Sequence, residues 1–158
     1  MNVNGGMKAV ENAAGKEIIL RLPLQPEGLM TVRMALYGVA VRMGFSFEAI
    51  EDLKVAVSEA CNHALLGLRG DRQDAVLMLV FSMQTGELAV RIGIQGASVT
   101  FRDALSPAAE PPGTVDSLDA IESGRIGLYL LQALVDEILV VPGETEGSEE
   151  IWLLKRLS

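Results

Sequence analysis

The sequence is poor in cysteine and histidine, which build disulfide frameworks and thiolate or imidazole metal sites. Among its 158 residues there is one cysteine, Cys61, and one histidine, His63. A single cysteine excludes an internal disulfide framework and is compatible with a reducing compartment. A single histidine has no second imidazole to share a metal ion, which makes a histidine-based zinc, copper or nickel site a poor expectation.

The sequence also lacks clustered positive charge and long apolar runs. Its 13 Lys and Arg against 21 Asp and Glu give a formal net charge of -8, which disfavours a nucleic-acid partner because phosphate-backbone binding needs clustered cations. The longest apolar run, AVLMLVF at 75–81, is too short to cross a bilayer, and the N-terminus has no apolar signal-peptide region. We therefore expect a cytoplasmic protein with no membrane partner.

What remains is a globular composition, with 49% hydrophobic and 22% charged residues. The length favours one domain. Residues 1–16 are polar and contain glycine, so we predict a flexible N-terminal tail followed by a single domain over 17–158.

Hydrophobic spacing and turn residues divide this domain into alternating elements. In chain order they are a strand at 17–24, helices at 27–44 and 47–67, strands at 74–83 and 87–94, a long loop at 106–124, a helix at 127–138, and strands at 138–142 and 149–157. Hairpin-linked strands with helices between them predict an α+β fold, a two-layer sandwich with a mixed, largely antiparallel sheet and helices on one face.

The stretch EDLKVAVSEACNHALLGLRG (51–70) contains a polar cluster of Glu59, Asn62 and His63 within the second helix. At about 100° per residue, His63 lies about 40° from Glu59 on one side and Asn62 about 60° on the other. A carboxylate can act as a general base, and an amide oxygen is a suitable ligand for Mg²⁺. The alternative is that these residues form the polar edge of an amphipathic helix.

The segments RMGFSFEAIEDLKVAVSEAC (42–61) and SGRIGLYLLQALVDEI (123–138) closely resemble the anti-sigma-factor serine protein kinases of the RsbW and sporulation type. These kinases belong to the GHKL superfamily, which also includes the histidine kinases and gyrase B. The resemblance covers about 17–157 and implies a Bergerat fold. It also implies a homodimer that binds a sigma factor, and that phosphorylates an anti-anti-sigma protein on serine or threonine with ATP and Mg²⁺.

The resemblance assigns roles on the second helix. Glu59 matches the catalytic general base. The family's Asn, four residues later, is His63 here, and Asn62 stands one residue early. We take Asn62 and His63 as candidate nucleotide-site residues and Asn62 as the candidate metal ligand.

Two further motifs complete the implied nucleotide site. In the family's Asp-x-Gly motif, whose Asp binds the adenine amino group, Gly96 is present but Ile94 replaces the Asp. A glycine-rich turn after an ATP lid would hold the phosphates, with Arg125 where the family has another glycine. Its candidate phosphate-binding residues are Gly124, Arg125, Ile126 and Gly127. The 106–124 loop matches the lid, although a plain surface segment is the alternative.

Two hypotheses of function follow. Loss of the adenine anchor and of the magnesium ligand would together remove about 3–6 kcal/mol of ATP binding, roughly two to four decades in affinity. This favours a binding module, an anti-sigma-like protein that has weakened or lost ATP use, over an active serine/threonine protein kinase in which Asn62 or water replaces the missing ligand. The predicted homodimer could use the first helix, which carries Met30, Met34 and Met43, unless these side chains only fill the core.

Overall fold

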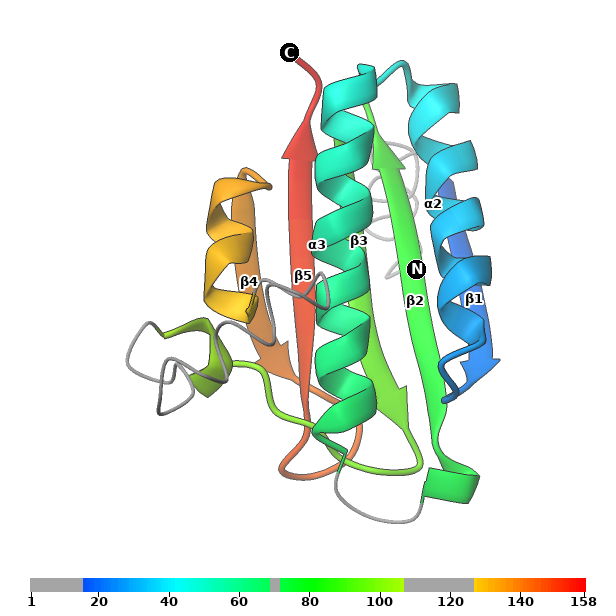
Figure 1. Cartoon of the computed structure of the whole chain (residues 1–158), viewed down its shortest axis with the longest axis vertical. Helices are drawn as coiled ribbons and strands as arrows, with labels where there is room; N and C mark the ends of the chain where they lie inside the picture. Colours follow the sequence, from blue (N-terminus) through cyan, green and yellow to red (C-terminus); the bar gives the residue numbers. More distant parts are fainter. Residues whose placement is uncertain (1–15, 69–71, 107–126) are drawn as a thin grey trace, which may run out of the picture.

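The computed structural model describes residues 16–68, 72–106 and 127–158 (Figure 1). Its regular elements are β1 (Lys16–Pro23), α2 (Gly28–Met43), α3 (Phe47–Leu66), β2 (Val76–Gln84), β3 (Glu87–Gln95), the 3₁₀ helix η4 (Leu128–Ala133), β4 (Glu137–Pro142) and β5 (Glu149–Arg156). Short 3₁₀ turns, η1 (Arg72–Asp74) and η2 (Asp103–Leu105), precede β2 and follow β3. The predicted two-layer α+β sandwich is confirmed.

The five strands form one sheet in the order β1-β2-β3-β5-β4, and each described pair is antiparallel. We predicted a mixed sheet, which would contain at least one parallel pair of strands. The described strands form no parallel pair, so that part of the prediction is wrong. The connections explain why. Two helices between β1 and β2 return the chain in the opposite direction, and β5 lies between β3 and β4, which run the same way.

Both long helices begin and end close to the predicted residues because their caps are local. Ser46 accepts a hydrogen bond from the backbone N–H of Ala49 at 3.1 Å, as expected of a helix N-cap. Gly44 ends α2 in the left-handed conformation, with φ of 93°, and its N–H donates to the carbonyls of Ala40 and Val41.

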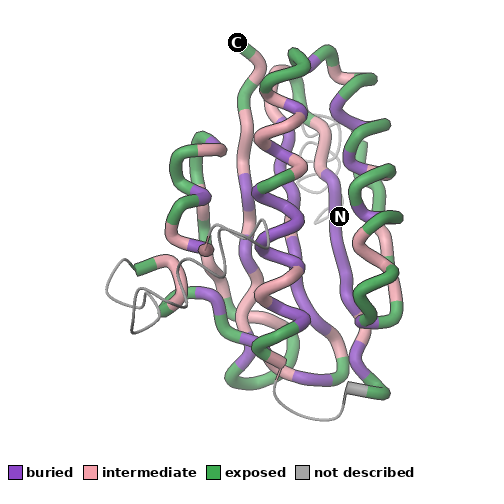
Figure 2. Tube along the Cα trace, viewed as in Figure 1, coloured by how far each residue is buried: buried purple, intermediate pink, exposed green. Residues whose placement is uncertain are grey.

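The core lies between the sheet and its single helical layer (Figures 1 and 2). The strands contribute alternate side chains to it, led by Leu79, Phe81, Val90 and Ile92, which are fully buried. On α3, residues 56, 60 and 64 are alanines with no exposed surface, and their small side chains let the helix lie close to the sheet.

The start of the first strand and the helix expected over 127–138 differ from the prediction. Lys16 already belongs to β1 instead of the tail, which otherwise lies outside the described residues. The expected helix over 127–138 is only the short η4, because the chain joins the sheet early: the N–H of Asp136 donates to Leu154 at 2.8 Å and β4 begins at Glu137. Most of the predicted 106–124 loop also lies outside the described residues.

Candidate functional site

The polar cluster predicted on the second helix lies on α3, within Phe47–Leu66. Glu59 is buried, with 5% of its surface exposed, whereas Asn62 and His63 are partly buried. Burial of Glu59 is unusual, because carboxylates are seldom fully buried in proteins. The neighbouring thiol of Cys61 is unsuited to act as a nucleophile, because burial raises its pKa to about 12 despite the opposing charge of Arg33.

His63 connects α3 to the segment that follows β3. Its Nε2 lies 2.6 Å from the carbonyl oxygen of Thr100, and its ring packs at 5.3 Å against Phe101. A carbonyl oxygen can only accept, so Nε2 carries the proton and has no lone pair for a metal ion. Besides lying on the polar face of the helix, His63 therefore holds the 97–102 segment in place.

The structure brings Ile94 and Gly96 to the end of β3 beside that segment. Ile94 is 4% exposed and packs in the core, opposite Leu77 on β2. Gly96 has φ of 86°, and a Cβ added there would lie 2.4 Å from the carbonyl oxygen of Asp74. Gly96 is therefore required by its own backbone geometry, whatever the site binds.

Two residues that the sequence did not point to hold the 97–102 segment from the sheet side. The hydroxyl of Ser148 accepts from the N–H of Val99 at 3.1 Å and donates to its carbonyl at 3.3 Å. One oxygen of Glu149 accepts from the N–H groups of Phe101 and Arg102, at 2.8 and 3.0 Å. These contacts join residues 47 to 49 positions apart, so no local pattern could have indicated them.

The same contacts set the charge state of Glu149. Burial raises the pKa of its carboxyl, but the N–H donors of Arg102 and Phe101 and the charge of Arg102 lower it more, so the pKa lies below the ordinary 4.5. Glu149 thus stays ionised at neutral pH and joins the start of β5 to the end of the 97–102 segment.

The predicted phosphate-binding turn is only partly described. Gly127, with φ of 81°, directly precedes η4, whereas Gly124, Arg125 and Ile126 lie outside the described residues. Of the other predicted site residues, Glu59, Asn62 and His63 lie together on α3. Ile94 and Gly96 lie at the end of β3.

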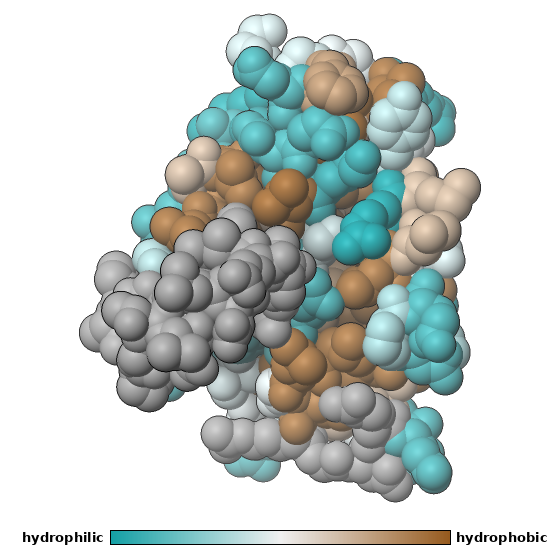
Figure 3. Space-filling model, in the orientation of Figure 1, coloured by the Kyte–Doolittle hydropathy of each residue, from teal (hydrophilic) through white to brown (hydrophobic). Residues whose placement is uncertain are grey.

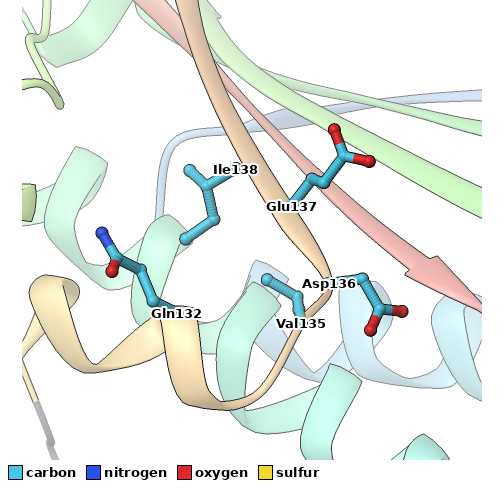
Figure 4. A pocket seen from close by; sticks show the side chains of 5 residues that line it. All are labelled: Gln132, Val135, Asp136, Glu137 and Ile138. Atoms are coloured by element: carbon cyan, nitrogen blue, oxygen red, sulfur yellow. The ribbon is translucent and has the colours of Figure 1, made fainter.

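A cavity of about 300 Å³ lies elsewhere, between η4 and β4 (Figure 4). It is lined by Gln132, Val135, Asp136, Glu137 and Ile138, none of them a predicted site residue. Asp136 accepts a hydrogen bond from the N–H of Arg156 at 2.6 Å, and Glu137 pairs with the Arg156 guanidinium. Both acidic side chains thus have partners within the fold, and we assign this cavity no function.

Two classes of feature are absent from the part of the chain that the structure describes. It contains no group of three or more His, Cys, Asp or Glu side chains placed to hold a metal ion. None of the described helices combines the length and the apolar character needed to cross a membrane.

Comparison with known proteins finds similar sequences over most of the chain. Residues 22–154 match the family model of the histidine kinase-like ATPase domain. The chain is 37% identical over 123 residues to the serine-protein kinase RsbW of Bacillus velezensis, covering 78% of this chain and 76% of that protein. The corresponding identities are 35% over 123 residues for the RsbW of Bacillus subtilis, covering 78% and 76%, and 32% over 122 residues for that of Listeria monocytogenes, covering 77% and 77%.

A solved structure shares the fold. The RsbU and RsbW domains of a Mycobacterium tuberculosis protein superpose with a TM-score of 0.61 at 19% identity. The match covers 90% of this chain and 32% of that one, so the present chain spans about a third of that longer protein.

Proposed function

Because the chain belongs to the RsbW family of serine-protein kinases, within the histidine kinase-like ATPase domains, we propose that it is an anti-sigma-like regulator of a partner-switching pathway. In this role it binds a sigma factor, an anti-anti-sigma protein, or both, in the cytoplasm. ATP binding and kinase activity are weakened or lost. The single domain proposed over 17–158, whose first strand begins at Lys16, carries these functions.

Ile94 is the observation that carries the proposal. The family implies ATP and Mg²⁺, and an adenine amino group needs a hydrogen-bond acceptor. Ile94 offers only hydrocarbon and is 4% exposed within the core. At the position where the family has its magnesium ligand, the Nε2 of His63 is already bonded to Thr100. The described residues thus fit ATP with Mg²⁺ poorly, and we derive no catalytic step through them.

Calorimetric titration of the purified protein with ATP and Mg²⁺ tests this part of the proposal. We expect no saturable heat at micromolar ATP and little thermal shift at millimolar ATP. The double variant Ile94→Asp with His63→Asn should gain about two decades or more in affinity, since it restores both anchors. Thermal unfolding without nucleotide is the control for folding. Micromolar binding by the unmodified protein would contradict weakened ATP use.

An active serine/threonine kinase is the second candidate, and Glu59 favours it. The carboxylate that matches the general base is retained, buried, on α3. Incubation with radiolabelled ATP and a candidate anti-anti-sigma protein distinguishes the active kinase from the binding module. Transfer of phosphate that is lost in Glu59→Gln would support the kinase, whereas no transfer supports the binding module.

The homodimer is a further part of the proposal, and the surface of α2 supports it. Met30, Met34, Tyr37 and Val41 are between 49% and 68% exposed. They follow one another at spacings of four, three and four residues, the arrangement of a coiled-coil seam. Met43 instead packs against the core, so the core-filling alternative applies to that residue alone of the three methionines.

Figure 3 shows apolar areas between hydrophilic ones on the face that the helices cover. Exposed apolar side chains that lie in one line indicate a protein-binding surface more strongly than scattered ones do, because one partner can bury them together.

A further inference from the structure

The strand β1 forms one edge of the sheet, and β2 is the only described strand that pairs with it. The N–H of Leu24 donates to the carbonyl of Ala75, its direct partner in the register, at 3.3 Å. Backbone groups alternate in direction along an antiparallel strand, so the N–H and C=O groups of Glu17, Ile19 and Arg21 point away from β2. This edge therefore presents a row of backbone donors and acceptors that no described strand pairs.

The opposite edge of the sheet, formed by β4, is partly closed. The carbonyl of Val140 accepts a hydrogen bond from the guanidinium of Arg102 at 3.0 Å, and Pro142 has no N–H to donate. On β1, by contrast, the apolar side chains of Ile18 and Ile19 are 36% and 51% exposed. An exposed apolar edge strand is a template for pairing with a strand of another chain, which makes β1 the better site for such an addition.

A second copy of β1 is the partner that the charges of this edge favour. Leu20 and Leu22 pack against the core. The alternating side chains of Glu17, Ile19 and Arg21 therefore project from the other face of the sheet. Glu17 and Arg21 are exposed, and neither forms an ion pair with another described residue. In an antiparallel copy centred on Ile19, each Glu17 lies opposite an Arg21, and opposite charges placed in this way stabilise a strand pair.

The same charges oppose the neighbouring registers. Centring the pair on Glu17 or on Arg21 would put two like charges directly opposite each other, which is destabilising. Centring it on Ile19 pairs all three outward residues and gives a self-complementary contact. Such a contact, in which both copies use the same patch, is what a two-fold dimer requires.

We propose that β1 pairs with β1 of a second copy about a two-fold axis at Ile19, which joins the two sheets into one. The inference rests on the homodimer proposed above and adds a sheet edge to its interface. The axis is perpendicular to the sheet, so the helices of both copies stay on one face. There α2 contacts β1 and lies on the same side of the molecule as the open edge (Figure 1). The α2 seam and the β1 edge are thus compatible as parts of one interface.

Sedimentation velocity of the full chain tests the charge pairing. Glu17→Arg and Arg21→Glu each put like charges opposite each other on both sides of the axis. We expect each to raise the dissociation constant of the dimer about tenfold. The double variant Glu17→Arg with Arg21→Glu exchanges the two charges and should restore the unmodified dissociation constant. Both side chains are exposed, so the variants should fold, and circular dichroism checks this.

An engineered cysteine tests the register. Residues that exchange hydrogen bonds in an antiparallel pair have Cα atoms about 5.5 Å apart, a distance that a disulfide can span. Ile19→Cys should therefore form a covalent dimer under mild oxidation, whereas the single cysteine of the chain, Cys61, is buried. The matched control is Ile18→Cys. It is also exposed, but it lies on the other face and opposite Leu20 of the second copy, so it should form no covalent dimer.

The possible results separate this contact from the homodimer as a whole. A dimer that is unaffected by the single charge reversals, or that forms no disulfide in Ile19→Cys, overturns the β1 pairing and leaves the homodimer to the α2 seam. A loss that the double reversal does not restore also overturns the pairing. An unmodified protein that is monomeric at tens of micromolar overturns the homodimer and this inference together.

Discussion

At the scale of single residues, Gly96 shows how a motif position can be kept for backbone reasons alone. Its φ of 86° disfavours any side chain, and the carbonyl of Asp74 occupies the place of a Cβ. Gly96 is thus necessary whichever residue stands at position 94. A glycine at a motif position therefore does not show that the motif still binds its ligand.

Gly96→Ala should therefore cost much more stability than a substitution that meets only the φ restriction. We expect a loss of about 3 kcal/mol or more in the free energy of unfolding, since both strain and overlap arise. Gly86→Ala is the matched control, because Gly86 has φ of 78° and no atom within 4 Å of an added Cβ, and about 1 kcal/mol is expected there. Urea denaturation of both variants makes the comparison, and equal losses would contradict the clash.

Glu149 gives a prediction for pH dependence. Its pKa is lowered in the folded protein, so its ionised form contributes stability at neutral pH, and that contribution is lost as the pH falls from about 4.5 through the folded-state pKa. Glu149→Gln should lower stability at pH 7 and lessen the decline on acidification. Urea denaturation at pH 7 and at a pH below about 4.5 measures this, with Glu146→Gln, an exposed residue of the turn before β5, as the control. A decline as steep as that of the unmodified protein would argue against the role of Glu149.

At the scale of elements, the outer face of α2 lacks a partner within the described fold. The seam of Met30, Met34, Tyr37 and Val41 lies away from the side of the helix that packs on the sheet, where Val32 and Leu36 are fully buried. Two such seams from two copies could pack side by side as in a coiled coil. The long stretch of exposed apolar surface on one helix is the physical reason for expecting a dimer there.

Met34→Glu should dissociate that dimer without unfolding the chain. Met34 is 68% exposed, so the carboxylate costs the monomer little, but in the seam it would be buried without a partner. Sedimentation velocity at tens of micromolar should change from dimer to monomer. The control Val55→Glu, at an exposed site on α3, should stay dimeric. A monomeric unmodified protein at this concentration would remove the dimer proposal altogether.

The bounds of some helices and strands could be predicted from the sequence, and those of others could not. The bounds of α2 and α3 were predictable because Ser46 and Gly44 act within a turn of their own helices. The replacement of a helix by η4 and β4 was not, because it depends on pairing of β4 with β5. In the site, helical spacing was enough to place Glu59 and His63 together, whereas the contacts of Ser148 and Glu149 depend on residues far away in the chain.

At the scale of the whole molecule, contacts within the chain hold the described scaffold together. The sheet, both long helices and the 97–102 segment are held by contacts within the chain, among them the His63 and Glu149 hydrogen bonds. None of these contacts needs a nucleotide to form. A scaffold held by contacts within the chain can present a partner surface without ATP.

The affinity for a protein partner should therefore be nearly independent of nucleotide. We expect the dissociation constant for a sigma factor or anti-anti-sigma protein captured from the native host to change less than about threefold between ATP with Mg²⁺ and EDTA, well under the tenfold that corresponds to 1.4 kcal/mol. Biolayer interferometry with the purified partner measures both conditions. The variant Ile94→Asp with His63→Asn is the matched control, since restored anchors should make partner binding respond to ATP. A tenfold loss of affinity on removing ATP from the unmodified protein would mean that its nucleotide site still controls partner choice.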